Sequence, residues 1–101
     1  MIQREHLRQL ALQARPNNWD LEGYYIVQIL ATIKKPKKLT MPYPSRPDVD
    51  NIAKEVLDAL QNSHGVAIMW KNDSHVIEVN VKKTYGDENK TKISVKNIKK
   101  G

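Results

Sequence analysis

The sequence predicts an α+β domain in which two helices pack on a mixed β-sheet, with the element order α-β-α-β-β-β. Two segments carry apolar residues at helical spacing, and the other apolar segments are either continuously apolar or alternate as strands do. A chain of 101 residues has room for one modest hydrophobic core. We therefore expect residues 1–101 to form a single domain.

The first two elements are expected to be a helix and a strand. Residues 2–15 predict an amphipathic helix that ends at Pro16. Its apolar side chains recur at helical spacing: Leu7, Leu10, Ala11 and Ala14. Residues 23–33 are apolar at both odd and even positions and rich in β-branched and aromatic side chains. That pattern predicts a central strand covered on both faces.

A basic, proline-rich loop separates this strand from the second helix. Residues 34–47 hold four lysines and four prolines with little periodic pattern, and loops of this length are often functional. The second helix follows, and its apolar stripe consists of Ile52, Ala53, Val56, Leu57 and Leu60. Glu55 and Asp58 are expected on its solvated face.

The C-terminal part predicts three further strands or strand fragments. Residues 66–70 and 76–85 flank a polar turn at 71–74, which indicates a hairpin. In the second of these runs, Ile77, Val79 and Val81 alternate with polar residues, as in a half-buried strand. A turn at 86–89 follows, and Ile93 and Val95 mark a last short strand.

The composition favours a polyanionic partner. Lys and Arg outnumber Asp and Glu by 17 to 11, the formal net charge is +6, and the pI is about 9.6. The absence of cysteine excludes a disulfide framework, a zinc–thiolate site and a thiol nucleophile. No segment reaches the roughly 18 apolar residues of a membrane span, and residues 1–6 show no apolar signal region. A cytoplasmic protein is the default expectation.

Residues 46–54 contain the most informative group of polar side chains. Asp48 and Asp50 stand two residues apart where an extended stretch enters the second helix, so we expect them to point to the same side. Lys54 follows Asp50 by four residues and shares its face if the helix has begun there. Two carboxylates about 5 Å apart repel by roughly 3 kcal/mol at an effective dielectric near 20, so they need a cation or a shared proton. Such oxygen ligands suit Mg²⁺, and in a basic chain they indicate phosphodiester chemistry on nucleic acid.

Each of these side chains also has a purely structural explanation. Either aspartate could be the N-cap of the second helix, and Lys54 could be an ordinary solvated lysine. Asp73 stands in a polar turn, where Asp is favoured on backbone grounds alone, and His75 follows two residues later. Trp70 could pack in the core or stack on an unpaired base. The histidines at positions 6, 64 and 75 have no close metal-ligand spacing.

Together, these segments resemble the RusA family of Holliday-junction resolvases, small phage-derived endodeoxyribonucleases. The resemblance rests on residues 46–60 (RPDVDNIAKEVLDAL), residues 70–76 (WKNDSHV) and the basic-aromatic strand end at 82–86 (KKTYG). It covers residues 46–86 well and the rest of the chain loosely. The ordered combination is specific, because each motif occurs in the family's order along the chain.

The resemblance implies a fold, an activity and a set of site residues. It implies three metal-binding carboxylates, Asp48, Asp50 and Asp73, and a catalytic lysine, Lys54. It also implies a homodimer whose two active sites use Mg²⁺ or Mn²⁺ to nick symmetric strands of a four-way DNA junction. The residues that we expect to contact DNA are basic: Lys34, Lys35, Lys37, Lys38, Arg46 and Lys71.

This chain departs from the family pattern in two places. The family's paired aspartates and following glutamine read Asn72, Asp73 and His75 here, which preserves the essential second acid. Family members also usually begin with a strand and a Gly/Lys/Arg-rich segment before the first helix, whereas this chain starts at that helix. We therefore expect the sheet to lack that edge strand and some DNA contacts.

Three hypotheses of different classes follow. The first is Mg²⁺-dependent, structure-specific cleavage of Holliday junctions in recombination and repair. The second is a catalytically weak or inactive module that binds DNA junctions or single strands. The third is a small RNA-binding α+β domain that uses Tyr24, Tyr25 or Trp70 as stacking platforms. The third leaves the three aspartates unexplained and ranks last.

Overall fold

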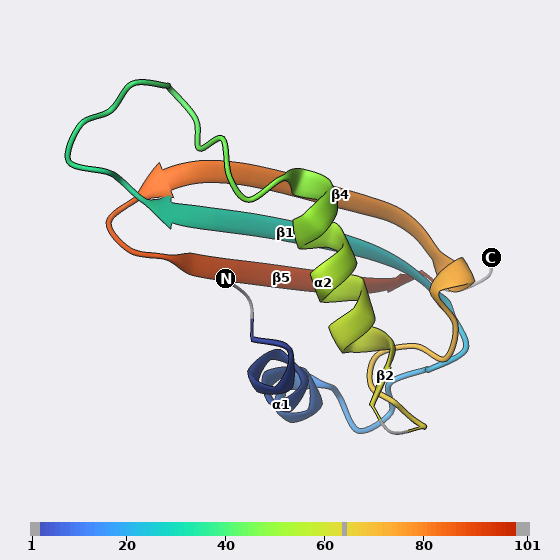
Figure 1. Cartoon of the computed structure of the whole chain (residues 1–101). Coiled ribbons are helices and arrows are strands. Elements are labelled where there is room, and N and C mark those ends of the chain that lie inside the picture. The colour runs from blue at the N-terminus through green and yellow to red at the C-terminus, as the bar shows by residue number, and fades with distance from the viewer. Residues whose placement is uncertain (1–2, 64, 99–101) are drawn as a thin grey trace.

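The computed structural model describes residues 3–63 and 65–98, and its principal elements are two helices and a three-stranded sheet (Figure 1). The helices are α1 (Arg4–Ala14) and α2 (Val49–Gln61). The sheet is built from β1 (Tyr24–Lys34), β4 (Val76–Gly86) and β5 (Lys90–Ile98). A small hairpin of β2 (Asn62–Ser63) and β3 (Val66–Ala67) follows α2, and a 3-10 helix, η1 (Asp73–His75), precedes β4. The α+β class and the order of the elements are as the sequence predicted.

The first strand is the centre of the sheet, as expected, because the strand order is β4-β1-β5. β1 pairs with β4 in parallel, which requires the connection through α2, and with β5 in an antiparallel arrangement. The register places Ile29 opposite Val81 on one side and opposite Ile93 on the other. Residues paired across a sheet share a face, so these apolar side chains all lie on the helix-covered side.

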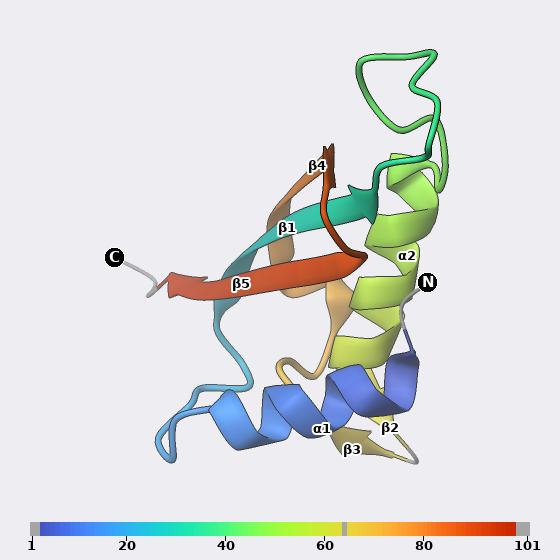
Figure 2. The same cartoon turned by 90° about the vertical axis from the view of Figure 1, so that its left-hand side faces the viewer.

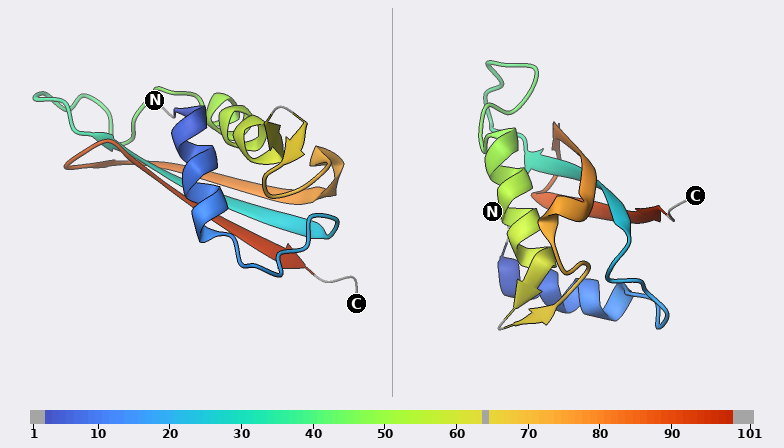
Figure 3. Two further views of the ribbon diagram at one scale, coloured as in Figure 1. Left: turned by 90° about the horizontal axis from the view of Figure 1, so that it is seen from below. Right: turned by 90° about the vertical axis from the view of Figure 1, so that its right-hand side faces the viewer.

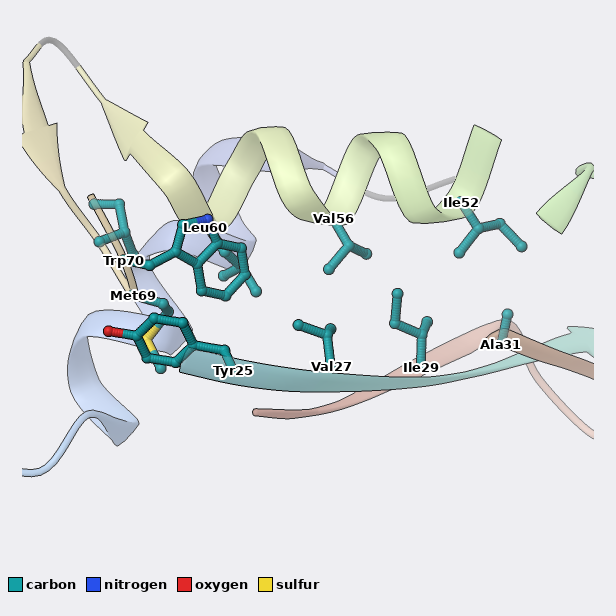
Figure 4. Close-up of a cluster of buried hydrophobic side chains, with 10 residues drawn as sticks. Tyr25, Val27, Ile29, Ala31, Ile52, Val56, Leu60, Met69 and Trp70 are labelled. Carbon is teal, nitrogen blue, oxygen red and sulfur yellow. The ribbon is translucent and has the colours of Figure 1, made fainter. Parts of the chain in front are cut away.

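The hydrophobic core lies between β1 and α2. Alternate residues of β1 (Tyr25, Val27, Ile29 and Ala31) are buried and point toward the helix (Figure 4). α2 contributes Ile52, Val56, Ala59 and Leu60, and the segment after the hairpin contributes Ile68, Met69 and Trp70. Trp70 is fully buried, which confirms the interpretation that it packs in the core. At roughly 1.5–3 kcal/mol for each large apolar side chain, this contact between helix and strand is the principal source of stability.

One face of the sheet carries no helix among the described residues, which corrects the expectation that β1 is covered on both faces. Both helices contact the core cluster on the other face, and Figure 2 and both panels of Figure 3 show α2 on one side of the strands. Gln28 and Leu30 on β1 are exposed on the uncovered side. The even positions of β1 are apolar enough to mimic burial, which is why the sequence pattern misled.

The predicted hairpin between residues 66–70 and 76–85 is also wrong. β3 pairs with β2, while β4 pairs with β1. The Met69 N–H donates to Leu60 O at 2.8 Å, which ties the chain after β3 to the C-terminal end of α2. The last strand is longer than predicted, because its outward-facing residues are polar and give no apolar signal.

The first helix, α1, lies close to where the sequence predicted it. α1 begins two residues later than predicted, and position 2 lies outside the described residues, as does His64. Of its apolar stripe, Leu7 and Ala11 pack on the core, whereas Leu10 is exposed.

The loop between β1 and α2 extends beyond the sheet (Figures 1 and 2). No described helix is long and apolar enough to cross a membrane.

Candidate active site

The start of α2 holds the two aspartates that the sequence singled out. The Ile52 N–H donates to Asp48 O at 3.1 Å, so Asp48 occupies the N-cap position and the helix begins at Val49. The Asp50 carboxylate accepts from the Asn51 N–H at 3.0 Å and lies in the first turn. Carboxylates at a helix N-terminus are stabilised by the helix dipole, typically by about 0.3–1 kcal/mol. Both acids therefore have a structural role as well as a candidate chemical one.

The structure does not bring Asp48 and Asp50 to the same side. Because the chain is already helical at Val49, residues two apart differ by roughly 200° around the axis and do not align as in an extended strand. Asp48 lines a large cleft, whereas Asp50 lines a smaller hollow beside β4. Lys54 lines the cleft with Asp48, and it forms no ion pair with Asp50 among the described residues.

The large cleft, of about 1100 Å³, lies between α1, α2 and the adjoining ends of β1 and β5. Its basic side chains come from four segments of the chain: Arg4, His6, Arg46, Lys54 and Lys90. Its acidic side chains are Asp48 and Glu55. The cleft is therefore a basic hollow of the kind that holds phosphate groups.

Arg4 neutralises Glu55 and also reaches Asp58. Its guanidinium Nε donates to Glu55 Oε2 at 2.8 Å and its Nη2 to Glu55 Oε1 at 3.1 Å, with a longer contact of 3.4 Å to Asp58 Oδ2. These hydrogen bonds lower the pKa of Glu55 and raise the pKa of Arg4. The two acids expected on a solvated face therefore bind α1 instead. The Asp48 carboxylate has no such partner among the described residues and is the free acid of the cleft.

Asp73 lies at the opposite end of α2 from the other two aspartates. Its Oδ1 accepts from the buried indole Nε1 of Trp70 at 2.6 Å, and Trp70 follows directly on the segment bonded to Leu60. Ten residues of helix separate Asp50 from Leu60, a rise of roughly 15 Å. Within residues 3–63 and 65–98, no three His, Cys, Asp or Glu side chains come close enough to hold a metal ion. One copy of the chain thus does not gather the three expected metal ligands.

The expected DNA-contacting residues fall on three surfaces. Arg46 lines the cleft. Lys35, Lys37 and Lys38 are exposed on the projecting loop, and Lys34 is exposed at the end of β1. Lys71 lies near Asp73, where its Nζ contacts Glu22 Oε1 at 3.2 Å.

Two of the three expected stacking platforms are unavailable. Tyr25 and Trp70 are fully buried, and their rings contact each other in a tilted arrangement with 5.5 Å between the ring centroids. Tyr24 stacks instead on His75 at 4.9 Å, and His75 Nδ1 lies 2.9 Å from Gly23 O. The RNA-binding hypothesis therefore loses its principal support.

Nothing in the sequence indicated Arg4 as a cleft residue, because its partner Glu55 is 51 residues away and no local pattern links them.

Comparison with known proteins gives the following findings. The chain matches the family model "Endodeoxyribonuclease RusA" over residues 3–96. It is also similar to "Uncharacterized protein YqaN" of Bacillus subtilis (strain 168), with 34% identity over 65 residues. The matched region covers 64% of this chain and 42% of that relative, so the chain spans less than half of the relative's length. No solved structure matches the chain.

Proposed function

Because the chain belongs to the RusA family of endodeoxyribonucleases, we propose that it cleaves four-way DNA junctions in recombination and repair, in the cytoplasm, with Mg²⁺ or alternatively Mn²⁺. The observation that carries this proposal is the cleft in which Arg46, Asp48 and Lys54 come together. A free carboxylate beside two cations provides for a divalent ion and for a phosphate in one hollow.

The candidate residues take distinct roles in this proposal. Asp48, Asp50 and Asp73, which one copy of the chain leaves apart, would hold the ion once they are brought together. Their oxygen donors fit Mg²⁺, which takes few carboxylates and completes its shell with water and phosphate oxygens. A bound divalent ion polarises a phosphate and activates water. Lys54 would stabilise the negative charge that develops on the phosphate during cleavage. Arg46, Lys71 and the loop lysines would bind the DNA backbone, so that binding weakens steeply with salt.

The separation of the aspartates leads us to propose a homodimer in which the partner completes the metal site. One copy offers Asp48 and Asp50 at one end of α2 and Asp73 at the other, roughly 15 Å further along the helix. In the proposed twofold dimer, the partner's Asp73 lies beside Asp50, and the symmetry then forms the reciprocal pair at the same time. Two equivalent sites of this kind suit symmetric nicking of a junction.

The first test is cleavage of a labelled four-way junction with Mg²⁺. The wild type should nick the junction symmetrically and leave a linear duplex intact. Asp50→Asn should abolish nicking, because the amide keeps the hydrogen bond to the Asn51 N–H but loses the metal-binding charge. Asp87→Asn is the matched control, since Asp87 is an exposed turn residue that lines neither hollow. Undiminished cleavage by Asp50→Asn would refute the proposed site.

A mixing experiment tests whether the partner completes the site. Asp50→Asn and Asp73→Asn proteins are each expected to be inactive, and they are then unfolded together and refolded as a mixture. If the site spans two copies, one site of each heterodimer carries both substitutions and the other carries none, so single-strand nicking returns. If each site lies within one copy, both sites of the heterodimer stay damaged and the mixture stays inactive.

The second candidate function is a module that binds DNA junctions or single strands without cutting. It is favoured by one observation, the absence of a three-carboxylate group within the described part of the chain. It predicts junction binding in EDTA and no nicking with Mg²⁺, Mn²⁺ or any other divalent ion. Metal-dependent nicking that Asp50→Asn abolishes would eliminate it.

A further inference from the structure

The uncovered face of the sheet is strongly basic. Strand register places Leu30 between Lys82 of β4 and Lys92 of β5, in one row across the sheet. The next row towards the loop pairs Thr32 with Lys90, and Lys34 ends β1 on the same face. Nearer the other end, Lys96 lies opposite Ile26. All five of these lysines are exposed.

Acidic residues are nearly absent from this face. In the three strands it carries a single acid, Glu78, to which the Asn80 amide donates a hydrogen bond at 2.7 Å. The helix-covered face has one lysine in these strands, Lys83, and its Nζ donates to Ser45 O at 3.2 Å. The outward lysines therefore concentrate charge on one side of the sheet, and burial in the core does not explain them.

We propose that the uncovered face of the sheet binds the phosphate backbone of a DNA arm. This inference rests on the proposed function and adds to it a second, extended DNA surface outside the cleft. Its occupant follows from charge complementarity, because five exposed lysines with one acid repel a second copy of the same face and attract a polyanion.

The geometry connects this face with the cleft. Lys90 and Thr32 belong to one row of the uncovered face and also line the cleft. Neighbouring strands lie about 4.8 Å apart and alternate residues about 6.7 Å apart, so the lysines form a grid roughly 10 Å wide along β4, β1 and β5. A backbone that leaves the cleft at Lys90 can continue along Lys92 and Lys96. Lysines contact phosphates as point charges, so this surface positions DNA without reading its sequence.

The test is DNA binding by the triple variant K82Q/K92Q/K96Q, measured in EDTA with a four-way junction and a duplex. These three lysines do not line the cleft, so the proposed catalytic residues remain untouched. If each lysine makes one phosphate contact, the salt slope of log K should fall by roughly 2 to 3. At about 0.1 M salt, the affinity should fall at least tenfold.

Two control variants separate charge from folding. K82R/K92R/K96R keeps the charge and should bind like the wild type, whereas E78Q removes the only acid of the face in these strands and should bind DNA severalfold more tightly. A triple glutamine variant with wild-type affinity and salt slope would overturn the inference. The inference would also be overturned if K82Q/K92Q/K96Q changed the oligomeric state but not DNA binding. That result would mean that the uncovered face joins two copies of the chain. A wild type that binds no DNA would instead refute the proposed function itself.

Discussion

The hydrogen bond between Trp70 and Asp73 allows the structural and the chemical role of Asp73 to be measured separately. Asp73 Oδ1 lies 2.6 Å from the Nε1 of Trp70, whose side chain is fully buried. Replacing Asp73 with alanine removes the acceptor and leaves the indole N–H of the buried Trp70 without its partner. Replacing Asp73 with asparagine keeps an acceptor oxygen but removes the negative charge.

The expected losses of stability differ between these two variants. An unpaired buried donor costs about 1–3 kcal/mol, and bonds to charged groups lie in the upper part of that range. We therefore expect Asp73→Ala to lower the free energy of unfolding by about 2–3 kcal/mol, and Asp73→Asn by about 1 kcal/mol. For a domain of this size, the alanine variant should melt roughly 10–20 °C below the wild type.

The assay is urea unfolding followed by tryptophan fluorescence, together with thermal melting by circular dichroism. Trp70→Phe serves as the second arm of a double-mutant cycle, because phenylalanine lacks the indole N–H. In that background, Asp73→Ala should cost much less, since no donor is left unpaired. An equal cost in both backgrounds, or an alanine variant as stable as the wild type, would refute this account of Asp73.

Two further predictions concern groups that take no part in the proposed metal site. Arg4 lowers the pKa of Glu55 below its ordinary value of 4.5 through their hydrogen bonds, so Glu55 contributes stability above that pH and loses it as pH falls through its folded-state pKa. The difference in urea midpoint between the wild type and Glu55→Gln should therefore be largest at neutral pH and shrink below about pH 4, and a constant difference would contradict the ion pair. Tyr25→Phe removes a buried hydroxyl that donates to Asp20 O and accepts from the Gly23 N–H at 3.0 Å. It should lower the free energy of unfolding by about 1–2 kcal/mol in guanidinium melts, and no change would exclude those bonds.

Local spacing was enough to predict the helices and the central strand. Ile52, Val56 and Leu60 recur at helical spacing, and the structure buries all three against β1. The same spacing failed for the surroundings of β1, because Ile26 and Leu30 are apolar although one face of the sheet carries no helix among the described residues. Periodicity reports which side chains prefer burial, but not whether the chain has an element to cover them.

For the candidate site too, part was predicted from the sequence and part depends on the tertiary structure. The resemblance of the motifs, in their order along the chain, predicted that Asp48, Asp50, Lys54 and Asp73 form a group. Their positions in space depended on contacts that sequence does not encode locally: the helix start at Val49, and the bond that ties Met69 to the end of α2. The helix start at Val49 turns Asp48 and Asp50 to different sides. The hydrogen bond from Met69 to Leu60 holds the segment that leads to Asp73 at the far end of the helix.

The sequence by itself determined the class of the fold and the basic character of the chain, and it nominated the candidate residues Asp48, Asp50, Lys54 and Asp73. These follow from residue types and from spacing within one element, which act over a few residues. Only the tertiary structure decided the partner of β4, the cleft shared by Arg4 and Lys54, and the uncovered face with its lysines. Each of these depends on which distant segments pair, and that choice is set by the packing of the whole core rather than by any segment alone.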